Sequence, residues 1–130
     1  MDTSALLALA NPRDQYHRRA TDLLNRASET GVTWVSTMLV LAELHNLLLR
    51  HLDPGRAVEI IQAFIDDETF MWVDVTDEIV QAAVNSWLIR FSDQPFSLTD
   101  AVSFEVMRRE KVTVAFAFDQ HFVVAGYRLL

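Results

Sequence analysis

Short strand-like segments alternate with helical ones along the whole chain, and this alternation limits the fold more than any other feature. Runs of β-branched and aromatic residues at 32–36, 69–75 and 112–118 are separated by segments with helical periodicity. Strands that alternate with helices usually pair in parallel through right-handed crossovers. The sequence therefore predicts an α/β fold, a three-layer sandwich with a twisted parallel sheet and helices on both faces, in one domain spanning residues 1–130.

Capping signals place the helices between these strands. Asn11, Asp53, Thr76 and Ser97 each stand at the start of a segment with helical periodicity. The helices are expected over residues 3–10, 11–31, 37–52, 53–67, 76–91 and 97–111, and residues 119–130 should form a final turn and a short strand. A sheet of this kind needs a strand ahead of the first helix, yet only Met1 precedes Asp2. The first strand is therefore expected to be truncated.

Composition restricts the chemistry. The chain has no cysteine, which excludes disulfides, zinc-thiolate sites and a cysteine nucleophile, so any metal must be held by oxygen or imidazole. No apolar run approaches the roughly 20 residues that span a bilayer, and the N-terminal stretch lacks the basic region of a signal peptide. We therefore expect a cytoplasmic protein without a membrane partner. The net charge of -7 argues against a surface that coats nucleic acid, although acids gathered around a metal also lower the charge.

Four acidic residues are the candidates for a functional site. Glu43 lies in "TMLVLAELHNLLLRHL", where its helical neighbours are mostly apolar, and burying an unpaired carboxylate there is costly. Asp2 precedes the first helix, Asp100 lies in the first turn of the helix at 97–111, and Asp119 directly follows a strand. Ligand sites in α/β sheets form where strands end and helices begin. The four carboxylates are therefore expected to converge on one cleft.

Each of these acids also has a purely structural interpretation. Asp2 fits a helix cap, Asp119 fits a cap for the following turn, and "SLTD" is a capping box in which Asp100 reaches back to the cap residue. Glu43 has Arg50 as a conceivable partner two turns away. The functional interpretation depends on all four occurring together.

The motifs around these acids resemble those of a known family. The segments "DTSALLAL", "LAELHNLLLR", "SLTDAVSFEVMRR" and "AFAFDQHF" are similar, in order, to the four acidic motifs of PIN-domain ribonucleases, and most closely to VapC-type toxins of toxin-antitoxin pairs. The resemblance covers essentially the whole chain and implies a PIN-like sandwich. It also implies that Asp2, Glu43, Asp100 and Asp119 are catalytic and bind metal. Secondary site residues would be Ser4, Asp93 and Thr99.

An all-oxygen set of ligands favours Mg²⁺ or Mn²⁺ as the cofactor. The expected reaction is hydrolysis of an RNA phosphodiester by water, with carboxylates assisting deprotonation and the cation stabilising charge on the phosphate and the leaving 3′-oxygen. The resemblance further implies a VapB-like antitoxin and a homodimer. Apolar residues in "FMWVDV" and at Ile79, Ala83, Trp87 and Phe91 are expected to supply the surface between protomers.

The remaining polar and aromatic residues give weaker signals. The histidines show no metal-ligand spacing and are expected at the surface or in the core: His17, His45, His51 and His121. Trp34, Trp72 and Trp87 are expected to pack rather than to stack on bases. Arg13, Arg18 and Arg19 either hold RNA phosphates or form a solvated helix face.

Two other functions fit parts of the sequence. A PIN-fold module that binds RNA or protein without catalysis is suggested by the truncated first strand, which would misplace Asp2. A phosphatase or phosphoacceptor domain is disfavoured, because no D-x-D pair follows a first strand and only Lys111 is available as the usual lysine.

Overall fold

Helices make up most of the chain, and four short strands connect them. The computed structural model describes residues 1–130. In chain order the elements are α1 (Thr3–Ala10), α2 (His17–Ser28), β1 (Trp34–Thr37), α3 (Met38–Leu48), α4 (Pro54–Ile65), β2 (Phe70–Val73), α5 (Asp77–Ala83), the π-helical turn η1 (Val84–Ile89), α6 (Leu98–Arg109), β3 (Val114–Ala115), α7 (His121–Val124) and β4 (Arg128–Leu129).

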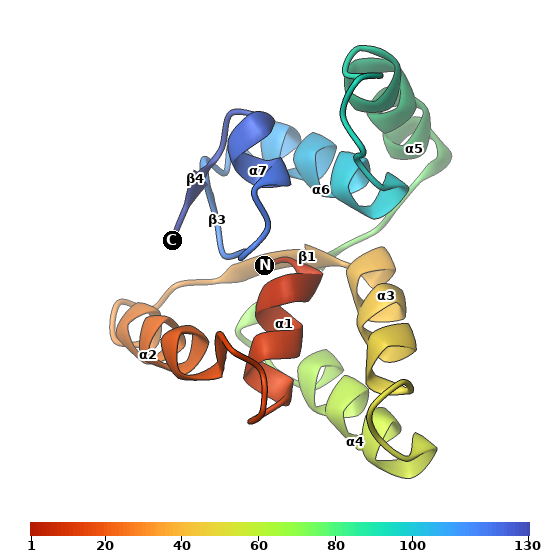
Figure 1. The fold of residues 1–130 in the computed structure, drawn as a ribbon. Coiled ribbons are helices and arrows are strands. Elements are labelled where there is room, and N and C mark those ends of the chain that lie inside the picture. The colour runs from red at the N-terminus through yellow and green to blue at the C-terminus, as the bar shows by residue number, and fades with distance from the viewer.

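The strands pair in parallel and have helices on both sides. β1 pairs with β2, with Trp34 opposite Phe70 and Thr37 opposite Val73, and β3 pairs with β4. Figure 1 shows α1 to α4 on one side of β1, and α5, α6 and α7 on the other. The predicted layered α/β architecture with parallel strands is confirmed, although the strands form two separate pairs instead of one continuous sheet.

Met1 and Asp2 lie between the two strand pairs, where they hydrogen-bond to both. The Met1 amino group donates to the Val35 carbonyl of β1, and the Asp2 backbone N–H donates to the Phe116 carbonyl just after β3, at 3.0 Å. A cavity of about 270 Å³ borders these residues, lined mostly by apolar side chains that include Trp34 and Val114. These two hydrogen bonds hold Asp2 between β1 and the end of β3, although no strand precedes α1.

Two expectations about local structure are wrong, and a third element is present but changes its helical form. Asn11 ends α1 instead of starting α2: its side chain accepts from the Arg13 N–H and the Asp14 side chain accepts from the Tyr16 N–H, so residues 11–16 form turns and α2 begins at His17. The helix expected over 76–91 is present and capped by Thr76, but after Ala83 it changes from α5 into the π-helical η1. The strand expected over 112–118 is reduced to β3; beyond it, Phe116 accepts from the Asp2 N–H and Phe118 donates to Ser4 Oγ instead of pairing with a strand.

The core consists of apolar clusters on both sides of the strands. Leu6, Val40 and Leu44 pack between α1 and α3, and on the other side Ile79 and Ala83 of α5 pack against residues of α6. Ile79 and Ala83 were expected on a dimer surface, and this prediction is wrong because both are buried within the protomer. None of the helices is long and apolar enough to cross a bilayer.

Candidate active site

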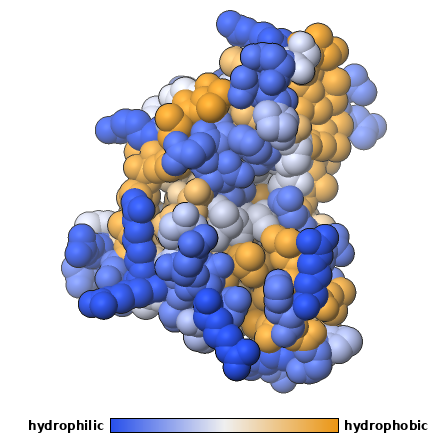
Figure 2. Space-filling model, in the orientation of Figure 1, coloured by the Kyte–Doolittle hydropathy of each residue, from blue (hydrophilic) through white to orange (hydrophobic).

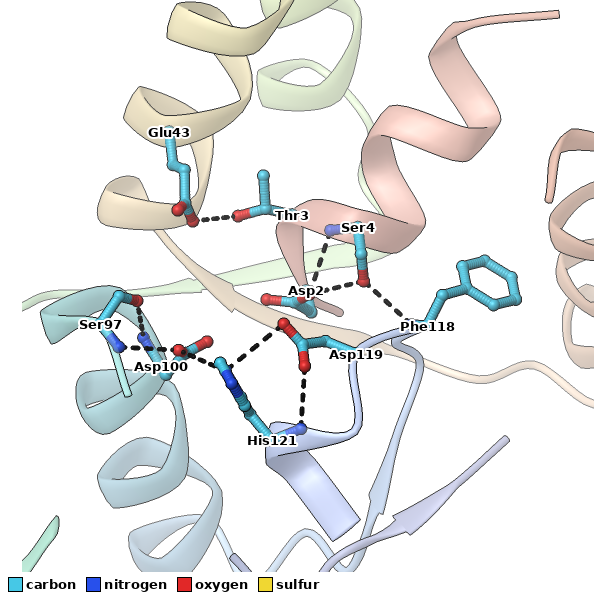
Figure 3. Close-up of polar contacts among 9 residues, drawn as sticks. All are labelled: Asp2, Thr3, Ser4, Glu43, Ser97, Asp100, Phe118, Asp119 and His121. Atoms are coloured by element: carbon cyan, nitrogen blue, oxygen red, sulfur yellow. Dashed lines mark hydrogen bonds and ion pairs between the residues drawn. The ribbon is translucent and has the colours of Figure 1, made fainter. Parts of the chain in front are cut away.

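Four carboxylates from four parts of the chain face one another. Figure 3 shows the side chains of Asp2, Glu43, Asp100 and Asp119 around one space beside the end of β1. They come from the start of α1, the middle of α3, the first turn of α6 and the segment between β3 and α7. Asp2 and Asp100 are buried, whereas Glu43 and Asp119 remain partly exposed. The structure therefore brings the four predicted acids together.

Asp2 is positioned by the first turn of α1. Its Oδ2 accepts hydrogen bonds from the Ser4 backbone N–H at 3.0 Å and from the Ser4 hydroxyl at 2.7 Å. Ser4 Oγ in turn accepts from the Phe118 N–H at 2.9 Å, which ties α1 to the residue ahead of Asp119. Asp2 is thus the N-cap of α1, as its structural interpretation predicted, and its other oxygen has no protein hydrogen-bond partner.

Glu43 is held by a residue that the sequence did not single out. The Thr3 hydroxyl donates to Glu43 Oε2 at 2.7 Å, across 40 positions of sequence, because α1 packs against α3. Arg50, the conceivable partner, is exposed beyond the end of α3, and Glu43 forms no ion pair. The carboxylate therefore faces the other three acids without a cation beside it.

Asp100 and Asp119 are connected through one histidine. Asp100 and Ser97 form the predicted capping box of α6, with Ser97 N–H donating to Asp100 Oδ2 at 2.8 Å. The Nδ1 of His121 also lies 3.0 Å from Asp100 Oδ2 and 3.4 Å from Asp119 Oδ2. Asp119 Oδ1 accepts from the His121 backbone N–H at 2.9 Å, so it caps the turn into α7 as predicted.

The electrostatics of the cluster favour binding of a cation. Burial raises the pKa of Asp2, an effect opposed by its hydrogen bonds from Ser4 and reinforced by the charge of Asp100. Burial also raises the pKa of Glu43, and the charges of the other three acids add to this. No lysine or arginine forms an ion pair with any of the four. Carboxylates that repel one another in this way form a suitable oxygen-rich site for Mg²⁺ or Mn²⁺.

Comparison with known proteins defines the family. The model of the PIN domain matches residues 1–126. The chain belongs to the PIN-domain family. It is 34% identical over 127 residues to the 23S rRNA-specific endonuclease VapC20 of Mycobacterium tuberculosis, in two strains, covering 98% of this chain and 93% of the relative. The crystal structure of that VapC20, described as a sarcin-ricin loop cleaving toxin, superposes with a TM-score of 0.86 at 33% identity, over 97% of this chain and 93% of the other. The resemblance to VapC-type proteins is confirmed.

His121 is the main site residue that sequence reasoning missed in this PIN domain. It was expected among the surface or core histidines, but its ring lies between two of the acids, and Asp100, Asp119 and His121 place one potential ligand atom each within 4.8 Å of one another. The available signal was its position two residues after Asp119 at a helix start. His17, by contrast, lies away from the acids as predicted for the histidines, with its Nδ1 2.7 Å from the Ala8 carbonyl oxygen.

The secondary candidates lie in different surroundings. Ser4 contacts Asp2 directly, as described above. Asp93 is exposed and accepts a hydrogen bond from its neighbour Gln94, and Thr99 is half-buried on α6 without a hydrogen bond to the acids. Besides Ser4, the hydroxyl of Thr3 also reaches the cluster, at Glu43.

The predicted RNA-binding arginines lie at exposed positions just before α2 and in its first turn. Arg13, Arg18 and Arg19 are all exposed, and Figure 2 shows hydrophilic surface over the α2 side of the molecule. The Arg19 guanidinium lies 5.6 Å from the centre of the Phe118 ring, which also stacks on Tyr16 at 4.5 Å. Since Phe118 directly precedes Asp119, Arg19 is connected to the acid cluster through one aromatic ring.

The tryptophans pack as predicted. Trp34 is buried against Phe116, and Trp72 stacks on Phe70 at 4.9 Å. Trp87 packs against Phe104 at 5.3 Å, within the aromatic core on the α6 side. All three are partly or fully buried, and none of them lies among the acids.

Proposed function

We propose that this chain is a single-domain, metal-dependent endoribonuclease toxin of the VapC type, with Asp2, Glu43, Asp100 and Asp119 as its catalytic and metal-binding residues. The observation that carries the proposal is the convergence of four carboxylates, without a lysine or arginine partner, in a PIN domain. The relatives are named for cleavage of 23S rRNA and of the sarcin-ricin loop, so a structured ribosomal RNA hairpin is the proposed substrate.

The residues of the site have separate tasks in this reaction. Bound among the carboxylates, Mg²⁺ or Mn²⁺ would supply positive charge for the phosphate and the leaving 3′-oxygen. Ser4 and Thr3 each hold one carboxylate oxygen, which fixes Asp2 and Glu43 in orientation. Glu43 Oε1 has no protein partner and is the proposed acceptor of the proton that the attacking water loses. Arg19 and its exposed neighbours Arg13 and Arg18 would bind the flanking phosphates.

The proposed partners are a VapB-like antitoxin and a second copy of the chain, with action in the cytoplasm. Ile79 and Ala83 are buried and would not contribute to the face for such contacts. A groove of about 360 Å³ between α3 and α4 is flanked by Met38, Val58 and Ile65, all more than 40% exposed. Figure 2 shows hydrophobic surface in this region. Exposed apolar surface of this kind supports a contact between proteins.

Cleavage of a sarcin-ricin hairpin RNA by the purified protein, in Mn²⁺, Mg²⁺ or EDTA, tests the proposal. We expect cleavage only with metal, and a loss of at least about a hundredfold for Glu43→Gln, since a metal site supplies several kcal/mol to the transition state. Glu59→Gln, the same substitution at an exposed glutamate of α4, should keep full activity. Intact RNA that is nevertheless bound would favour the non-catalytic module, and release of phosphate from phosphomonoesters would favour the phosphatase.

A further inference from the structure

His121 contacts two of the four acids at once. Its Nδ1 lies 3.0 Å from Asp100 Oδ2 and 3.4 Å from Asp119 Oδ2, and its backbone N–H donates to Asp119 Oδ1. Asp100 therefore receives one contact from His121, and Asp119 receives two. Of the four histidines, the other three make no contact with these carboxylates.

The ring of His121 is itself fixed in place. Phe96 packs edge-to-face against the imidazole, with centroids 5.4 Å apart and an interplanar angle of 71°. Phe96 is buried and also packs against Phe104 in the aromatic core beneath α6. Only 27% of the His121 side chain is exposed. The imidazole therefore has a defined orientation, with Nδ1 toward the acids.

The contacts of Asp100 show which way the hydrogen bond runs. A carboxylate oxygen accepts, and Asp100 Oδ2 already accepts from the Ser97 N–H, so Nδ1 of His121 carries the hydrogen and donates. A nitrogen that donates has no lone pair to offer to a metal. Asp100 Oδ1, which has no hydrogen-bond partner in the protein, is left to face the site.

We propose that His121 is a positioning residue, whose Nδ1 donates to Asp100 Oδ2 and lies 3.4 Å from Asp119 Oδ2, and which so holds both carboxylates in the orientation that binds the divalent cation. This inference rests on the proposed function. Outer groups that orient metal-binding carboxylates commonly contribute about 10- to 100-fold to metal affinity. His121 would act through its two neighbours and would not itself coordinate the metal.

The test compares three variants of the full chain by Mn²⁺ binding, measured from the electron paramagnetic resonance signal of free Mn²⁺. His121→Asn places an amide nitrogen close to the position of Nδ1, whereas His121→Gln carries it to the position of Nε2, and His121→Ala removes it. We expect Asn to bind Mn²⁺ within about threefold of wild type, and Gln and Ala to bind about 10- to 100-fold more weakly. His51→Gln, at an exposed histidine, is the matched control and should match wild type. Melting in EDTA confirms that each variant folds.

Several outcomes would overturn the proposal. Wild-type affinity for Mn²⁺ in the Gln and Ala variants would show that the hydrogen bond from His121 Nδ1 does not contribute to metal binding. An Asn variant as weak as Ala would show that packing of the ring on Phe96 matters instead of the donor. Nitrogen coupling to bound Mn²⁺ in pulsed spectra of wild type, lost on His121→Ala, would make the imidazole a direct ligand. Failure of the wild-type protein to bind Mn²⁺ would instead overturn the proposed function, and this inference with it.

Discussion

Removing one charge from the acid cluster should stabilise the metal-free protein, and Asp119→Asn is the substitution that tests this most directly. The asparagine keeps the oxygen that accepts from the His121 N–H, so the turn into α7 retains its cap. What it removes is the negative charge beside Asp100. The cluster has no lysine or arginine partner, so the loss of that charge relieves repulsion from Asp100. The one charged contact that changes is the distance of 3.4 Å from Asp119 Oδ2 to Nδ1 of His121.

The magnitude follows from the distance between the two acids. The nearest potential ligand oxygens of Asp100 and Asp119 lie within 4.8 Å, where two unit charges repel by about 3.5 kcal/mol at an effective dielectric constant of 20. The Asp119 side chain is 40% exposed, and the Nδ1–H of His121 donates to Asp100 close to Asp119, so solvent and that dipole reduce the figure to about 1 to 2 kcal/mol. In EDTA, the melting temperature of Asp119→Asn should therefore exceed that of wild type by about 3 to 8 °C.

With metal bound, wild type should melt at a higher temperature than Asp119→Asn, the reverse of the order in EDTA. A cation at a hundred times its dissociation constant adds about 2.7 kcal/mol to the unfolding free energy by mass action, and Asp119→Asn should gain much less of it. Thermal unfolding followed by circular dichroism, in EDTA and in millimolar Mn²⁺, measures both effects. Asp22→Asn, at an exposed acid of α2, changes the net charge by the same amount and controls for general repulsion. The reasoning is refuted if Asp119→Asn melts no higher than wild type in EDTA.

Three further results are expected. In EDTA, the melting temperature should rise as the pH falls from about 6 toward 5, because the raised pKa values of Asp2 and Glu43 make the native state take up protons before the unfolded one. Above that range the Met1 amino group, whose pKa burial lowers to about 6, acts in the opposite direction. Saturating Mn²⁺ should suppress the rise, and a flat profile below about pH 6 in EDTA would contradict this. Glu105 is fully buried, and hydrogen bonds from Arg108 are the main reason that its pKa is lowered to about 2. Glu105→Gln should therefore lower the unfolding free energy by about 2 kcal/mol in urea titrations at neutral pH, without changing the shift in melting temperature that Mn²⁺ induces. A variant as stable as wild type would argue against a stabilising ion pair at Glu105. Arg19→Gln should weaken RNA binding and reduce the slope of log affinity against log salt by about 1 in fluorescence anisotropy, whereas Arg56→Gln on α4 should leave the slope unchanged.

The sequence predicts those parts of the structure that depend on neighbours within one or two helical turns. The capping box of Ser97 and Asp100 is contained in four residues, and Asp53 caps α4 through a bond to the Arg56 N–H, only three positions on. The layered arrangement could also be predicted, because each strand and each helix is recognised from the pattern of residues within that element. The four acids could be placed at one edge because each stands at or near the end of such an element, apart from Glu43, which was singled out by its apolar neighbours.

What the sequence did not predict depends on contacts between distant segments. His121 meets Asp100 across 21 positions and Thr3 meets Glu43 across 40, and no local pattern specifies either pair. The late start of α2 was missed because Asn11 bonds to a backbone N–H two residues on, which forms a turn instead of capping a helix. The burial of Ile79 and Ala83 was missed because it depends on how α5 packs against α6.

The structural and the functional interpretations of the acids turn out to be compatible. Asp2 caps α1, Asp100 completes the capping box of α6, and Asp119 caps the turn into α7. In each of the three aspartates, one carboxylate oxygen accepts a hydrogen bond from a backbone N–H. Asp2 and Asp100 each keep a second oxygen with no hydrogen-bond partner in the protein, which remains available to the cluster. An alanine at these positions would remove a cap as well as a charge, and a lost cap alone costs about 1 kcal/mol. Asparagine, which caps helices about as well as aspartate, separates the two effects, so the proposed metal site is best tested with amide substitutions.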